Sequence, residues 1–136
     1  MKFKFIEHTA DVGIEAWGDD LAEAFENAAI GLFEIMTDTS KVEQTEKREF
    51  EVESEDKQSL LYDFLEKFLI LRDSEGLMFS KFKVSIEGNK LKAEAWGEEF
   101  NSEKHESKTE VKAITYMDMQ VGKKDDKHFV RVIVDI

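Results

Sequence analysis

The chain has 136 residues and carries 31 acidic side chains against 19 lysines and arginines, which gives a formal net charge of −12. This length fits one domain of the usual size, about 100–150 residues, and a hydrophobic content of 41% supplies one core. A pI near 4.7 argues against a protein that grips nucleic acid over a broad surface, because phosphate contacts need clustered lysine and arginine. We therefore expect a single domain over residues 1–136.

The residue types that are missing exclude further classes of protein. With no cysteine, disulfide scaffolds, zinc–thiolate sites and thiol nucleophiles are excluded. No segment approaches the roughly 18 apolar residues of a membrane span, and the first residues lack the apolar run of a signal peptide. We expect an intracellular domain that functions in the cytoplasm.

The first half of the chain predicts two strand-like pieces followed by a helix. The strand-like pieces flank residues 7–13. Apolar residues then recur every three or four positions from Asp20 to Met36, which is the period of an amphipathic helix. Asp20 followed by Glu23 resembles a capping box, with aspartate in place of serine or threonine.

The second half predicts one more helix among strands. A second helical period runs from about Asp56 to Arg72, and the remaining segments alternate with the period of two that is typical of strands. These strands are predicted at residues 49–53, 82–86 and 91–95, with a tight turn at 87–90, and at 111–121 and 129–136. The order predicts an α+β domain, with two amphipathic helices on one face of a mostly antiparallel or mixed sheet in two layers.

The last strand points to a candidate cation site. Val130, Val132, Val134 and Ile136 form one apolar face, so Asp135 lies on the other face, close to the α-carboxylate of Ile136. Two carboxylates held together repel unless a proton or a cation lies between them, and oxygen ligands suit Ca²⁺ or Mg²⁺. The alternative is a frayed, solvated end of the chain.

Two other segments carry candidate functional residues. Residues 7–13 place His8 and Asp11 within a few residues of each other, next to Gly13, which suits a positive φ or a close backbone approach. In residues 110–116, Lys112 lies on one face with an acid and an aromatic residue, where it would balance charge or contact a phosphate. The alternatives are a loop-capping aspartate, a hydrogen-bonded histidine in a turn, and a solvated strand lysine.

The chain shows none of the common catalytic signatures. It has no glycine-rich phosphate loop, no Gly-x-Ser-x-Gly elbow, no His-Glu-x-x-His and no EF-hand loop. The three histidines are far apart in sequence and lack the spacing of metal ligands. We therefore expect a protein that is not an enzyme by itself.

Taken together, several segments resemble the archease family, and the resemblance covers essentially the whole chain. Each motif is short, and the signal comes from their order and from the length of the chain. The segments are residues 7–13 (Glu-His-Thr-Ala-Asp-Val-Gly), 24–29 leading to Met36-Thr37-Asp38, 60–65, 110–116 (Glu-Val-Lys-Ala-Ile-Thr-Tyr) and 132–136. One departure is Met117, because many members of the family have histidine after Thr-Tyr.

The resemblance implies a small cofactor protein of the RtcB-type tRNA-splicing ligase. A family member promotes guanylylation of the ligase, supports multiple turnover and broadens its nucleotide use. The resemblance also implies a divalent metal, Ca²⁺ or Mg²⁺/Mn²⁺, held by Asp11, Asp135 and a main-chain or terminal oxygen of Ile136, and a functional role for Lys112. This requires that the loop with Asp11 and the closing dipeptide meet in the fold.

Two other functions remain open at the level of the sequence. One is a chaperone-like or modulating adaptor of RNA-modifying enzymes such as tRNA methyltransferases, which would need an exposed apolar patch. The other is a stand-alone metal-dependent phosphohydrolase that uses the same acids. The acidic charge favours a basic protein partner such as the ligase over direct, strong binding of nucleic acid.

Overall fold

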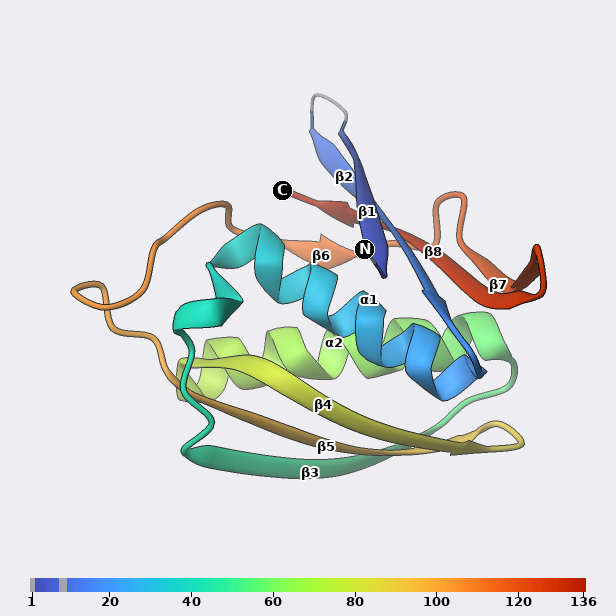
Figure 1. Cartoon of the computed structure of the whole chain (residues 1–136), viewed down its shortest axis with the longest axis horizontal. Coiled ribbons are helices and arrows are strands. Elements are labelled where there is room, and N and C mark those ends of the chain that lie inside the picture. Colours follow the sequence, from blue (N-terminus) through green and yellow to red (C-terminus); the bar gives the residue numbers. More distant parts are fainter. Residues whose placement is uncertain (1, 8–9) are drawn as a thin grey trace.

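Two antiparallel sheets enclose two helices in the computed structural model, which describes residues 2–7 and 10–136, without the side chain of Glu7 (Figure 1). The elements in chain order are β1 (Phe3–Glu7), β2 (Asp11–Gly18), α1 (Leu21–Met36), η1 (Thr39–Lys41), β3 (Glu46–Glu53), α2 (Lys57–Glu75), β4 (Leu77–Glu87), β5 (Lys90–Glu99), β6 (Ala113–Ile114), β7 (Gln120–Lys124) and β8 (Lys127–Asp135).

Helix α1 begins where the sequence predicts. The Asp20 carboxylate accepts the Glu23 N–H at 2.8 Å, and the Glu23 carboxylate accepts the Asp19 N–H at 2.9 Å. One N–H group of the first helical turn and that of the residue before the cap are thereby paired. In a regular capping box the glutamate accepts the N–H of the cap residue. Here Glu23 accepts the N–H of Asp19 instead, so the predicted capping box is confirmed with this bond shifted by one residue.

Helix α2 begins after Asp56, whose carboxylate accepts the Ser59 N–H at 2.7 Å. It ends at Gly76, which has a φ of 68° and donates its N–H to the Arg72 carbonyl. Only glycine adopts this left-handed conformation without a steric cost, which explains the position of the stop. The predicted helix is confirmed, and it continues three residues beyond Arg72.

The three-stranded sheet has the order β3–β5–β4 and includes the predicted hairpin at residues 87–90. Its inner face packs on the helices, and its outer face pairs lysines with glutamates across neighbouring strands. Gly97 in β5 is required by packing, because a Cβ there would lie 1.8 Å from the Met78 carbonyl oxygen. The β4–β5 register also shifts at this point, between Phe79 and Lys81.

The five-stranded sheet has the order β1–β2–β8–β6, and β7 also pairs with β8. The prediction of one strand over residues 111–121 was wrong, because only 113–114 and 120–124 pair regularly with β8. A turn between them, in which the Met119 N–H bonds to the Tyr116 carbonyl and Asp118 has a φ of 49°, interrupts the ladder.

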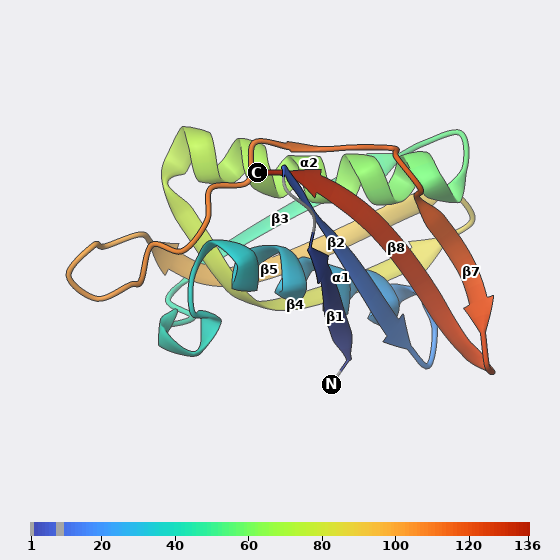
Figure 2. The same ribbon diagram turned by 90° about the horizontal axis from the view of Figure 1, so that it is seen from above.

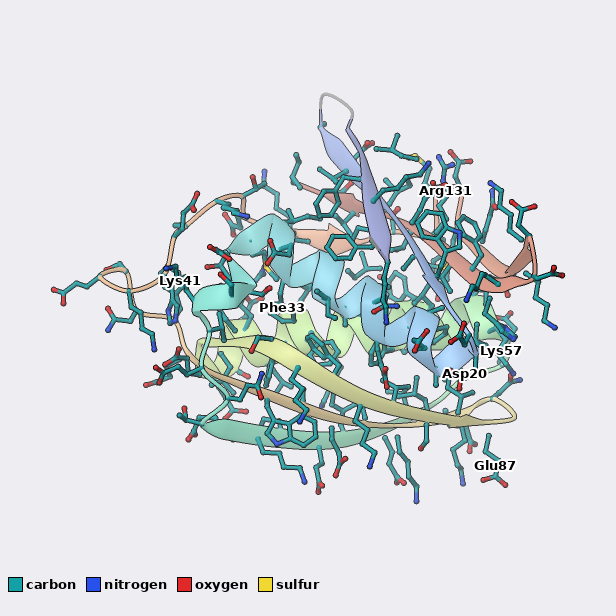
Figure 3. All side chains as sticks on the ribbon, viewed as in Figure 1. Asp20, Phe33, Lys41, Lys57, Glu87 and Arg131 are labelled. Atoms are coloured by element: carbon teal, nitrogen blue, oxygen red, sulfur yellow. The ribbon has the colours of Figure 1, made fainter. Side chains whose placement is uncertain are left out.

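The α+β class is confirmed, but the two-layer arrangement with helices on one sheet face was wrong. Both helices lie between the two sheets and contact each of them (Figure 1). A helix that is covered on both sides must be apolar on more than one face, and α1 satisfies this with ten buried residues. Fully buried phenylalanines of both helices, such as Phe33 of α1 and Phe68 of α2, fill this middle layer, and Figure 3 labels Phe33 there.

The described part of the chain contains no helix that is both long enough and apolar enough to span a bilayer.

Candidate metal centre

The candidate site lies where β2, β8 and β6 run side by side. Asp11 pairs with Asp135, and Asp135 pairs on its other side with Ala113. Side chains of directly opposed residues point to the same face of a sheet, with Cβ atoms about 4.5–5.5 Å apart. The Asp11 and Asp135 side chains therefore share one face, the face turned away from the helices.

Main-chain hydrogen bonds fix the end of β8 at this site. The Ile136 N–H donates to the Ala10 carbonyl at 3.3 Å, and the Lys112 N–H donates to the Asp135 carbonyl at 2.8 Å. The last residue is therefore tied to β2 on one side, while Asp135 is tied to the segment before β6 on the other. Figure 2 shows β2 and the end of β8 converging at this point. The structure thus brings together Asp11, Asp135 and Ile136, which sequence reasoning had grouped.

The environment of the Asp11 carboxylate fits a cation ligand. Its Oδ1 atom is buried and has no hydrogen-bond partner among the described residues. Leaving a buried carboxylate oxygen unpaired costs the free energy of its desolvation. The opposed Asp135 carboxylate adds like-charge repulsion across the strands. A divalent cation would relieve both costs.

The donor atoms available here are carboxylate and main-chain oxygens. Within the described ranges, the structure contains no group of three or more histidine, cysteine, aspartate or glutamate side chains arranged to hold a metal ion. A cation at Asp11 and Asp135 would therefore need the main-chain or terminal oxygen of Ile136 as well. Such a set of oxygen donors suits Ca²⁺, Mg²⁺ or Mn²⁺ rather than a metal that prefers nitrogen or sulfur.

Lys112 lies beside this site and is held by its main chain. Besides the bond to Asp135, the neighbouring Val111 carbonyl accepts a hydrogen bond of 2.7 Å from the Arg72 guanidinium of α2. The Lys112 side chain is exposed, and no carboxylate of the described residues lies within 4.0 Å of its Nζ. Its charge is therefore available to a phosphate or a carboxylate of a partner.

Two further sequence expectations have different outcomes. His8 lies outside the described residues. Gly13 does not adopt a positive φ, but the close approach is confirmed, because a Cβ there would lie 3.2 Å from Ile133 Cδ1 and 3.3 Å from Ile6 Cβ. The small residue lets the Ile133 side chain cover the strand next to Asp11, and Ile133 is almost fully buried even though it lies on the outer face.

A charged group on the same outer face was missed from the sequence. Glu15 is buried, and its carboxylate lies 3.3 Å from Lys4 Nζ and 3.5 Å from Arg131 Nη1. Arg131 projects from this face in Figure 3. The alternation of β8 puts Arg131 on the same face as Asp135, but its partner Glu15 depends on the pairing between β2 and β8. Glu15, Lys4 and Arg131 thus have counter-charges on this face.

Comparisons with known proteins agree on one family over the full length of the chain. The profile of the Archease protein family (MTH1598/TM1083) matches residues 3–136. Protein archease of Thermococcus kodakarensis is 53% identical over 98% of this chain and 96% of its own length. Protein archease of Sulfurisphaera tokodaii is 50% identical over 99% of both chains.

Solved structures match the fold as well. The solution structure of protein 1598 from Methanobacterium thermoautotrophicum has a TM-score of 0.88 and 48% identity, covering 99% of both chains. The crystal structure of an archease from Thermotoga maritima, described as a possible chaperone, has a TM-score of 0.68 and 29% identity, covering 98% of this chain and 96% of its own. The pairing of β2 with β8 therefore belongs to a fold that these proteins share.

Proposed function

This chain belongs to the archease family, and we propose from this premise that it activates an RtcB-type tRNA-splicing ligase in the cytoplasm. In this role it promotes guanylylation and multiple turnover of the ligase and broadens its nucleotide use, without catalysing a reaction by itself. The observation that carries the proposal is the Oδ1 atom of Asp11, which is buried opposite Asp135 and has no hydrogen-bond partner among residues 2–7 and 10–136.

The proposed ligands of the divalent ion are Asp11, Asp135 and a main-chain or terminal oxygen of Ile136. When bound, the ion would supply positive charge that offsets phosphate charge during nucleotidyl transfer. The two carboxylates would hold it at the rim of the sheet, and the bonds from Ile136 to Ala10 and from Lys112 to Asp135 keep that rim in place. The exposed Lys112 ammonium would contact a nucleotide phosphate or a ligase carboxylate beside it.

The net charge of −12 supports a protein partner over direct binding to tRNA. An enzyme that binds RNA presents lysine and arginine to the phosphates. An acidic activator is attracted to such a surface and repelled by free RNA.

Two variants test the metal centre separately from the fold. Ca²⁺ or Mn²⁺ should raise the Tm of the unsubstituted protein. Asp11→Asn and Asp135→Asn each remove one carboxylate charge while keeping the shape, and both should lose this rise. Both should also lose the stimulation of ligase turnover. Asp126→Asn, in the exposed turn between β7 and β8, is the matched control for loss of one negative charge. If both site variants kept the metal-induced rise in Tm and the stimulation, the metal centre would be refuted.

A separate pair of variants tests the role of the Lys112 side chain. Lys112→Met keeps the length of the side chain and removes its charge, so ligase stimulation should fall while the metal-induced rise in Tm stays. Lys123→Met, on exposed β7, is the control. Equal stimulation by the two variants would remove Lys112 from the mechanism.

A chaperone-like role is the second candidate, because the related Thermotoga protein is described as a possible chaperone and Tyr116 and Met117 are exposed here. Suppression of client aggregation, for example of a tRNA methyltransferase, by the Asp135→Asn variant would favour it. Hydrolysis of a phosphorylated substrate by the purified protein would instead favour a metal-dependent phosphohydrolase.

A further inference from the structure

An aromatic projection lies next to the candidate metal centre. The rings of Tyr62, from α2, and Tyr116, from the turn after β6, are parallel within 5° with centroids 4.4 Å apart. Tyr116 is 53% exposed and the adjacent Met117 is 58% exposed. We refer to Tyr62, Tyr116 and Met117 as the tyrosine patch.

The tyrosine patch is held rigidly by the segment that carries it. Thr115 donates both its N–H, at 3.1 Å, and its hydroxyl, at 2.8 Å, to the Ile133 carbonyl of β8. The Thr115 hydroxyl also accepts the Met117 N–H at 3.2 Å, and the Met119 N–H closes the turn on the Tyr116 carbonyl. The main chain of the turn is held by these bonds and the Tyr116 ring by its stacking on Tyr62, so both lose little conformational entropy on binding.

The patch and the metal centre lie on the same short stretch of chain. Ala113 is opposite Asp135, and Tyr116 follows three residues later, at most about 11 Å away even when fully extended. Lys112 lies on the other side of Ala113. Tyr116 stacks on α2 while Asp135 lies on the face turned away from the helices, so a partner would have to cover the β6 edge of the sheet to contact both.

The charge around the tyrosine patch is acidic. Glu66 lies one helical turn from Tyr62, and Asp118 lies next to Met117 in the exposed turn. Burial and the negative charge of Glu66 both raise the pKa of Tyr62, so its hydroxyl stays neutral beside that carboxylate. On the outer face of the three-stranded sheet, by contrast, lysines and glutamates pair with one another and offer no single sign of charge.

We propose that the tyrosine patch is the docking surface for the RNA ligase, seated against an apolar pocket with a basic rim beside the ligase's nucleotide site. Tyrosine and methionine are enriched in interface cores, and a few such residues carry most of the binding free energy. The acidic residues Glu66 and Asp118 set the orientation and speed the encounter with the basic rim. This inference rests on the proposed function, because the partner is the ligase.

The test measures Kd between the full chain and its cognate ligase. Replacing both exposed side chains, as Tyr116→Ala with Met117→Ser, should weaken binding by about ten- to a hundredfold, the range of interface hot spots. Tyr116→Phe keeps the ring and should bind within about threefold of the unsubstituted chain. Trp96→Ala, on the outer face of the opposite sheet, is the control for loss of an aromatic side chain and should bind normally. An unchanged Kd for the double variant would overturn the proposal.

Two further measurements separate this inference from the proposed function. A docking defect is overcome at high concentration, so the Tyr116/Met117 variant should restore ligase turnover at saturation, whereas Asp135→Asn should bind the ligase and fail to stimulate it at any concentration. Asp118→Asn should reduce the association rate more at low salt than at high salt. If the unsubstituted chain neither bound nor stimulated the ligase, the proposed function itself would be refuted. If the unsubstituted chain bound and every patch variant bound equally well, only the docking surface would be refuted.

Discussion

The Glu98 carboxylate of β5 holds the start of the segment that leads to the candidate site, and its loss should have a defined pH dependence. It accepts the Glu43 N–H at 2.6 Å, lies 2.8 Å from Lys104 Nζ, and is 3.0 Å from Nε2 of the buried His105. The Asn101 N–H donates to Nδ1 of His105 at 2.9 Å. The neutral ring therefore carries its proton on Nε2, facing Glu98.

The magnitude follows from the shift in the pKa of Glu98. Burial alone would raise this pKa, but the hydrogen bonds from Lys104, Glu43 and His105 outweigh it and lower the pKa from 4.5 to about 2. The difference corresponds to about 3 kcal/mol of stability as an upper bound. Because Lys104 is 37% exposed, solvent screening reduces this, and we expect about 1–2 kcal/mol for Glu98→Gln at neutral pH.

The direction of the pH dependence follows from the pKa of Glu98, which is lower in the folded than in the unfolded state. The stabilisation is fully present above the unfolded value of 4.5 and is lost as the pH falls through about 2. Urea unfolding of the unsubstituted chain and of Glu98→Gln should therefore show a difference in free energy at neutral pH that falls by more than half near about pH 3. Glu87→Gln, in the exposed hairpin turn, controls for the loss of a charge. A difference that stayed constant from neutral pH to about pH 3 would refute the linkage.

Three other substitutions test the packing that supports the site, each by urea or thermal unfolding. Phe68→Ala removes a fully buried ring from the middle layer and should cost about 3–5 kcal/mol; a loss below about 1 kcal/mol would mean that the surrounding rings collapse into the space. Gly97→Ala places a Cβ 1.8 Å from the Met78 carbonyl, so the β4–β5 pairing should open and the protein should unfold at markedly lower urea; normal stability would disprove the close approach. Asp20→Ala removes the cap of α1 and should cost about 1 kcal/mol, whereas Asp20→Asn should cost little.

The features that sequence reasoning predicted correctly depend on neighbouring residues. Asp20 caps α1 as predicted, because its carboxylate reaches the Glu23 N–H three residues ahead. The turn at residues 87–90 forms because Gly88 adopts a φ of 63°. The alternation in the last strand predicted that the Asp135 and Val134 side chains lie on opposite faces of the sheet. The burial of Val134 and the exposure of Asp135 confirm this.

The errors arose where the structure depends on distant residues. Residues 111–121 alternate well enough for one strand, but Tyr116 stacks on Tyr62 of α2 and the chain turns there. Similarly, Arg72 donates to Val111 across 39 positions of sequence, which no periodicity indicates. The apolar residues around α1 were consistent with one covered face, and only the second sheet explains why nearly all of them are buried.

The sequence by itself determined the two helices with the N-cap of α1, the hairpin, the two faces of the final strand and the acidic charge, because each depends on chemistry within a few residues or on composition. Only the tertiary structure decided that β2 pairs with β8, that the strands divide into two sheets, and that Oδ1 of Asp11 is buried opposite Asp135 without a partner in the described part of the chain. Pairing across more than a hundred residues is selected by the burial of the whole core, and the local pattern of a strand is compatible with many neighbours.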